Sequence, residues 1–178
     1  MRILLKNSST VKRLCLLALL ISQALVLSIV EGMLPIPIGI PGIKLGLANI
    51  ITIVSLVYFG YLDTLFIILI RCIIASLFTG GPVIFLFSIA GAIFSASIMW
   101  LLLKILPNFL SLVGISIAGS IFHNIGQITI ACLLMSDMSV IYYLPVLLIS
   151  GIFMGCFVGF CSSFLIKAMK KIKLFSMI

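Results

Sequence analysis

The sequence predicts an all-α membrane protein, a bundle of six transmembrane helices with an ordered loop between the first two. Only 8% of the 178 residues are charged and 64% are hydrophobic, whereas a soluble domain carries about 25% charged residues. The apolar residues fall in successive runs near the roughly 20 residues that a helix needs to cross a bilayer. What remains is too little for a soluble module. Residues 1–178 are therefore expected to form one integral membrane domain.

The distribution of charge predicts the orientation. Residues 1–13 and 167–178 are basic tails, and six spans place both on one side together with Lys104. Only Lys44 falls on the opposite side, and Arg71 falls within a span. Because segments rich in Lys and Arg stay on the cytoplasmic side, we expect a multi-pass plasma-membrane protein with both termini in the cytoplasm. Topology thus explains the net charge of +8, and no nucleic-acid partner is expected.

The first span is predicted over residues 14–30. A basic start followed by an apolar run also occurs in secretory signals, but more apolar runs follow and no clean cleavage site lies at the right distance. We therefore interpret this run as an uncleaved helix. Ala18 and Ser22 form a small-xxx-small pair, a spacing that lets another helix approach closely. We expect this pair to serve helix packing or the docking of a partner.

Residues 31–49 are predicted to form an ordered, apolar lid over an outward-facing site. Three prolines and four glycines prevent one continuous helix there. The lid contains few polar groups, and we expect Glu31, Lys44 and Asn49 to reach the site. For Lys44 the alternative is an interfacial anchor. For Glu31 it is a helix-end carboxylate that faces water.

The second and third spans are predicted over residues 47–59 and 64–78. Each has about 15 residues, or roughly 22 Å of helix, which is short for a hydrocarbon core of about 30 Å. Either the apolar residues of the lid complete the second span, or the two runs form a re-entrant hairpin buried in protein.

The remaining spans are predicted over residues 83–106, 112–135 and 141–166. The glycines and proline of residues 78–82 end the third span. In the sixth span small residues recur every four positions, at Gly151, Gly155, Gly159 and Ser163. Such a ridge is typical of tight helix packing, within the bundle or against a partner subunit.

Arg71 is the most informative single residue. It lies near the middle of the third span, where an arginine costs about 2.5–3.5 kcal/mol on insertion scales. We expect it to face the bundle interior and to clamp a carboxylate or phosphate of a ligand. The alternative is a structural ion pair with Glu31 or Asp63.

The fifth span carries a polar stripe about 100° wide, at 100° per residue. Its members are Ser116, Ser120, His123, Asn124 and Gln127. We expect His123, Asn124 and Gln127 to line the same binding cavity as Arg71. The alternative is interhelical hydrogen bonding, which is common in bundles.

Motifs for catalysis and for cofactors are missing from the sequence. The three acidic residues, Glu31, Asp63 and Asp137, are scattered, and there is no P-loop. The five cysteines form no Cys-x-x-Cys pair and are interpreted as small buried hydrophobic residues. We therefore expect no metal, no cofactor and no catalytic activity of the chain itself.

Several stretches resemble one known family. They are Pro41–Asn49, Arg71, Phe78–Gly81 and Ala118–Gln127. Over roughly residues 14–168 the chain resembles the bacterial Gx transporter family, also labelled heptaprenyl diphosphate synthase component I. That family is similar to the six-helix S components of energy-coupling-factor (ECF) transporters, whose loop between helices one and two covers an outward-facing site. In those proteins small residues of helix one dock the energising subunit, and Ala18 and Ser22 match that role loosely.

The resemblance implies two functions. The first is binding and uptake of a small solute, anionic because the expected pocket is cationic, with energy from an ECF-type coupling subunit and ATPases. The second is a non-catalytic accessory subunit for prenyl diphosphate or quinone synthesis, or for flavin-based electron transfer. Prenyl diphosphate synthesis needs clustered aspartates that hold Mg²⁺ against a diphosphate, and this chain has no such cluster. A purely structural membrane scaffold is a third alternative, and it would not need Arg71.

Overall fold

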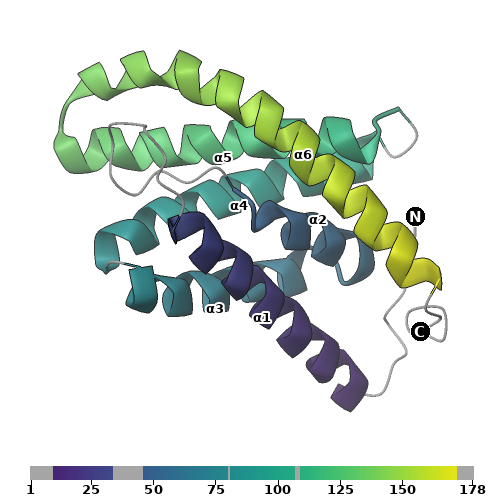
Figure 1. Ribbon diagram of the computed structural model, residues 1–178. Helices are drawn as coiled ribbons and strands as arrows, with labels where there is room; N and C mark the ends of the chain where they lie inside the picture. Colours follow the sequence, from purple (N-terminus) through teal and green to yellow (C-terminus); the bar gives the residue numbers. More distant parts are fainter. Residues whose placement is uncertain (1–9, 34–45, 80, 107–108, 172–178) are drawn as a thin grey trace.

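The computed structural model describes residues 10–33, 46–79, 81–106 and 109–171, and throughout these ranges the regular structure is helical (Figure 1). The elements are α1 (Thr10–Met33), α2 (Asn49–Tyr58), α3 (Tyr61–Thr79), α4 (Pro82–Ile105), α5 (Leu112–Met135), the 3-10 helix η1 (Met138–Tyr143) and α6 (Leu144–Lys171). The predicted all-α fold with six main helices is confirmed. Five of them are long and apolar enough to cross a membrane, and α2 is the exception.

The polarity of the bundle is that of a protein surrounded by lipid. Large apolar side chains such as those of Val26, Phe153 and Phe160 are exposed on the outside. Polar side chains, among them those of Arg71 and Gln127, are buried inside. Because lipid offers no hydrogen-bond partners, polar groups of a membrane bundle turn toward one another.

The short helix α2 is the centre of the bundle. All ten of its residues are buried, and it packs against each of the other five α-helices. Ten residues give only about 15 Å of helix. Its ten residues include no charged side chain, which fits a helix that is buried on every face.

Two contacts show that the chain traverses the bundle between residues 46 and 63. At one end, the carboxylate of Glu31 near the end of α1 accepts hydrogen bonds from the amides of Gly46 and Leu47. At the other end, Asp63 in the first turn of α3 forms a salt bridge with Arg13 near the start of α1, at 2.6 Å. Residues 46–63 therefore run from one end of α1 to the other, which argues against a hairpin that turns back halfway.

Several helix boundaries differ from the predicted ones. α1 begins at Thr10, so Lys12 and Arg13 belong to the helix rather than to a basic tail. The predicted sixth span is divided into η1 and α6, and α6 continues to Lys171. The basic residues at these ends do not stop a helix, because exposed Lys and Arg are good helix formers.

The turn between α3 and α4 was predicted correctly. Gly81 has φ 91°, a conformation that L side chains rarely adopt, and Pro82 begins α4. Proline is favoured at the first position of a helix because the amide that it lacks would have no partner there. Ser111 precedes α5 as its N-cap, where its hydroxyl accepts a hydrogen bond from the amide of Gly114.

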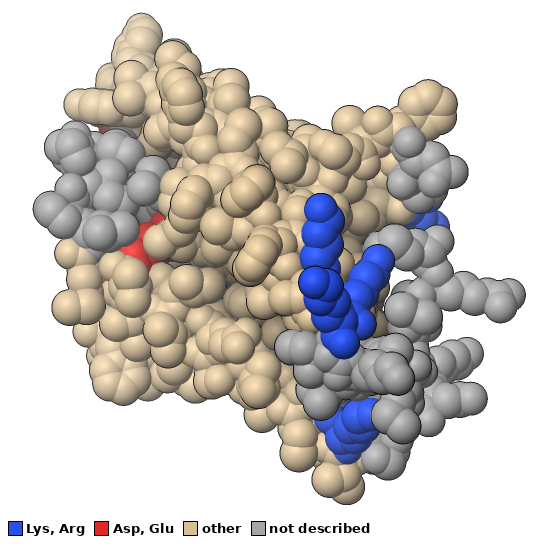
Figure 2. Space-filling view, turned by 45° about the vertical axis from the view of Figure 1, so that its right-hand side comes forward, with Lys and Arg blue, Asp and Glu red and all other residues tan. Residues whose placement is uncertain are grey.

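The exposed Lys and Arg side chains that the structure describes gather at one end of the molecule, whereas Arg71 is buried in the interior. Figure 2 shows them over the region where α1 begins and α6 ends, and it shows red side chains toward the opposite end; Asp63 lies at the basic end, where it pairs with Arg13. The fold thus preserves the asymmetry of charge that the sequence predicts.

Candidate functional site

The predicted binding residues are buried together with other polar groups in the interior. Among them, Glu31, Asn49, Arg71, His123, Asn124 and Gln127 are each at most 5% exposed. Lys44 and most of the predicted lid lie outside the described residues. Burial of this many polar groups is costly unless each finds a partner. The contacts that each one makes therefore indicate which of them are structural and which are available to a ligand.

Glu31 joins the end of α1 to the segment that leads into α2. Its two carboxylate oxygens accept hydrogen bonds from the backbone amides of Gly46 and of Leu47, the latter at 3.1 Å. The side chain is 2% exposed, so the alternative of a carboxylate that faces water is wrong. A carboxylate is stabilised at this place because the amides at a helix start carry partial positive charge. Glu31 therefore holds the two flanks of residues 34–45 together.

We expect Glu31→Gln to loosen this junction. A neutral amide oxygen accepts more weakly than a carboxylate, and the loss of a charge-assisted hydrogen bond costs about 1.5–3 kcal/mol. Hydrogen exchange at the Gly46 and Leu47 amides should accelerate, and the melting temperature in detergent should fall. Unchanged exchange at both amides would contradict this role. Glu31→Asp, which keeps the charge but shortens the reach, should give an intermediate result.

Gly46 lies between Asn49 and His123. It has φ 91°, and a Cβ atom added there would come within 2.8 Å of the Asn49 amide nitrogen and 3.6 Å of the His123 ring. On the other side of His123, a Cβ atom on Gly91 of α4 would lie 2.9 Å from the imidazole. Two glycines thus make room for one histidine, from the lid side and from α4.

Asn49 has an unsatisfied side chain at the start of α2. It is 1% exposed, and neither its amide nitrogen nor its oxygen has a hydrogen-bond partner. An amide can donate two hydrogen bonds and accept two. A buried group of this kind is expensive to leave unpaired, which makes Asn49 available to a ligand next to His123.

Arg71 carries a buried positive charge, and among the described residues its hydrogen-bond partner is Ser28. The guanidinium donates to the hydroxyl of Ser28 on α1 at 2.9 Å, while its Nε has no partner. The side chain is 5% exposed. The alternative of an ion pair with Asp63 is wrong, because the Asp63 carboxylate is bound by Arg13.

Ser28 connects Arg71 to the Glu31 junction. Ser28 and Glu31 are three residues apart on α1, so they lie on the same face, about one turn from each other. These polar residues therefore form one continuous group. We call the group the polar cluster, and its members are Arg71, Ser28, Glu31, Gly46, Asn49 and His123. Ser28, Gly46 and Gly91 were missed by the sequence analysis. For Ser28 the signal was its position one turn before an intramembrane acidic residue.

The polar stripe of α5 is divided between two neighbouring helices. The side of the stripe that carries His123 faces α4, because the His123 ring lies next to Gly91 of α4. The row with Asn124 faces α6, where the Asn124 amide donates to the carbonyl oxygen of Leu147 at 2.5 Å. For Asn124 the alternative of interhelical hydrogen bonding is thus observed. Gln127 is 0% exposed, and its role as a ligand contact stays a prediction.

The glycine ridge of α6 packs against α5. Added Cβ atoms would come within 2.6 Å of the Ile117 Cα at Gly155 and of the Val113 Cα at Gly159, and within 2.7 Å of the Asn124 amide at Gly151. Of the two predicted roles, packing within the bundle is the one observed.

Ala18 and Ser22 are exposed on α1 and take no part in the interior packing. Beside them, a groove of about 580 Å³ lies between α1 and α6, and Ile50 and Ile51 of α2 form its floor. Ser22 lines this groove. The two residues are thus accessible to a partner, and docking there stays a prediction. Among the cysteines, Cys72 is buried but Cys15 and Cys156 are exposed, so the expectation that all five are buried is wrong.

Comparison with known proteins gives one match. The family model described as heptaprenyl diphosphate synthase component I matches residues 20–165. No curated protein and no solved structure matches the chain. The matched range contains Glu31, Asn49, Arg71 and His123, and thus the whole polar cluster.

Proposed function

Since this chain belongs to the heptaprenyl diphosphate synthase component I family, we propose that it is a non-catalytic membrane protein that binds a small anionic solute inside its helix bundle. The proposal places the solute at the polar cluster, with its negative charge on Arg71. Asn49 and His123 would contact its polar groups, and Gln127 and Lys44 are further candidates.

The charge of Arg71 is the observation that carries this proposal. Arginine stays protonated in proteins, and a buried charge without a counter-charge is strongly unfavourable. The hydroxyl of Ser28 supplies a dipole but no negative charge. An anionic ligand would complete the site by offering both a charge and acceptors to the guanidinium, whose planar geometry suits carboxylate and phosphate groups.

Uptake of the solute is the second part of the proposal. We infer that the basic end of the bundle faces the cytoplasm, because Lys and Arg concentrate there. The Glu31 junction then lies toward the outer face, and the solute would enter from that side. The sequence contains no P-loop, so energy would come from a separate coupling subunit with ATPases. The exposed Ala18 and Ser22 are available for docking such a subunit.

A thermal-shift screen tests the binding proposal. The purified protein in mild detergent would be heated with inorganic phosphate, inorganic diphosphate, and mono-, di- and tricarboxylates, each paired with a neutral compound of similar size. A ligand at a hundred times its Kd stabilises the folded state by about 2.7 kcal/mol. We expect at least one anion to raise the melting temperature while its neutral counterpart does not. Equal shifts from charged and neutral compounds, or no shift from any anion, would overturn the proposal.

An accessory role in prenyl diphosphate metabolism is the second candidate. The description of the family favours it, and a diphosphate is also an anion that Arg71 could bind. Quinone synthesis and flavin-based electron transfer are related settings. Gentle extraction followed by mass spectrometry of co-purifying proteins separates the candidates. A transporter should retain a coupling subunit with ATPases, whereas an accessory subunit should retain a prenyl synthase or redox proteins.

A further inference from the structure

A second lateral groove lies between α3 and α5, along one side of α4. It has a volume of about 460 Å³. α4 packs against both α3 and α5, while those two helices do not contact each other along their described lengths. One face of α4 therefore forms the floor, Tyr61 of α3 closes one side and Phe122 of α5 the other.

The groove runs from one surface of the bundle toward its middle. The residues that line it on α4 extend from Ile93 to Leu101, and a separation of eight residues corresponds to about 12 Å of helix. The Tyr61 ring is 5.1 Å from that of Trp100, and the Tyr61 hydroxyl is hydrogen-bonded to Ser97 at 2.9 Å. Asp63, which forms the salt bridge with Arg13, is only two residues after Tyr61. Because charged groups lie at the membrane surface, we place this end of the groove at the level of the lipid headgroups.

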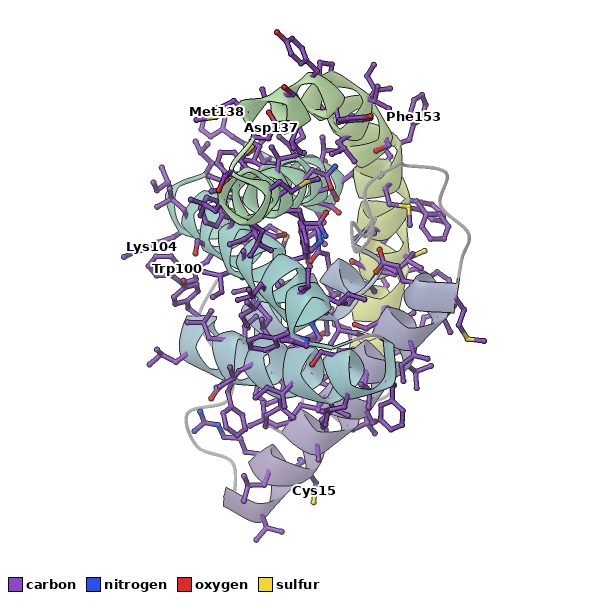
Figure 3. The ribbon with its side chains drawn as sticks, turned by 90° about the vertical axis from the view of Figure 1, so that its left-hand side faces the viewer. Cys15, Trp100, Lys104, Asp137, Met138 and Phe153 are labelled. Carbon is purple, nitrogen blue, oxygen red and sulfur yellow. The ribbon has the colours of Figure 1, made fainter. Side chains whose placement is uncertain are left out.

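The Lys104 ammonium lies at the headgroup end of this groove. The Lys104 ammonium lies over the Trp100 ring, 5.0 Å from its centroid. Figure 3 shows both side chains projecting from the same side of α4. Lys104 is exposed, and the salt bridge found among the described side chains does not involve it. Its charge is therefore available to an anion at this end of the groove.

We propose that this groove binds one acyl chain of an anionic phospholipid, with the lipid phosphate held by Lys104. The walls are apolar except for the Tyr61 and Ser97 hydroxyls, which already bond to each other. Ile93 and Phe94 are 40% and 42% exposed along the groove, so an occupant from the surrounding hydrocarbon can enter sideways. The ligand must thus be an amphiphile with a long apolar chain. The Lys104 ammonium at the headgroup end favours a negative headgroup.

Native mass spectrometry of the full-length protein tests this inference. Phosphatidylglycerol and phosphatidylcholine with the same oleoyl chains would be titrated into the protein in detergent. We expect preferential retention of phosphatidylglycerol, and a loss of about fivefold in that preference in Lys104→Gln. Lys170→Gln is the matched control, since Lys170 is equally exposed but lies on α6, and it should keep the preference. Ile93→Trp should fill the groove and reduce retention of both lipids.

Photocrosslinking locates the acyl chain of the bound lipid and does not depend on the measured affinities. Phosphatidylglycerol with a diazirine in mid-chain should label peptides that contain Phe94 or Phe122. Labelling only elsewhere, or the same loss of preference in Lys170→Gln as in Lys104→Gln, would overturn the proposal. Tighter retention of farnesyl diphosphate than of phosphatidylglycerol, abolished by Ile93→Trp, would also overturn it in favour of an isoprenoid occupant. None of these outcomes depends on solute binding at Arg71.

Discussion

Arg71→Met should make the ligand-free protein more stable and should abolish its stabilisation by anions. Methionine fills a similar volume without a charge, so the substitution removes a buried cation that forms no salt bridge with the described side chains and whose insertion costs about 2.5–3.5 kcal/mol. Replacement of buried charges by apolar groups of similar size is often stabilising by about 1–4 kcal/mol. Ser28 loses a donor, but a serine hydroxyl in a helix can bond to its own backbone.

The measurement is scanning fluorimetry of both proteins with and without inorganic diphosphate and citrate as probes. Arg13→Met is the matched control, because Arg13 is the partly exposed arginine of the salt bridge to Asp63. It should lower stability by less than about 1 kcal/mol and leave the response to anions intact. A large loss of stability in ligand-free Arg71→Met, combined with an unchanged response to both probes, would show that Arg71 is structural.

Gly155→Ala should separate α5 from α6 and lower stability strongly. The new Cβ atom would lie 2.6 Å from the Ile117 Cα, which is backbone and cannot rotate away. Overpacking of this kind costs about 1–3 kcal/mol. For a chain of this size that corresponds to a fall of about 2–12 °C in melting temperature. Asn124, which donates to Leu147 across the same interface, should lose its hydrogen bond as the helices move apart.

Gly114→Ala provides the control for this prediction. Gly114 lies in the first turn of α5, and the nearest atom to an added Cβ is the flexible end of Leu110 at 3.4 Å. Alanine is favoured over glycine in a helix by about 0.5–1 kcal/mol, so this substitution should leave stability unchanged or slightly raised. Equal melting temperatures for Gly155→Ala and the wild type would show that the helices can move apart at no cost.

Some contacts of the site depend on which helix faces which neighbour. The sequence analysis placed five polar residues of α5 on one stripe, which is correct as helix geometry. It expected three of them, His123, Asn124 and Gln127, to line one cavity, with interhelical hydrogen bonding as the alternative. In the structure His123 faces Gly91 of α4, and Asn124 is hydrogen-bonded to α6. A stripe of about 100° is wide enough to meet two neighbours, and helical periodicity carries no information about where those neighbours cross.

The sequence alone determined the membrane environment, the helices, the turn at Gly81 and Pro82, and the burial of Arg71. Each of these follows from local composition, because a helix that crosses lipid must be long and apolar, and a charge within it must turn inward. Only the tertiary structure decided that α2 is the core, that Glu31 binds the Gly46 and Leu47 amides, and that Arg13 takes the Asp63 carboxylate. These pairings join residues 15 to 50 positions apart. They depend on how whole helices pack, which no local pattern specifies.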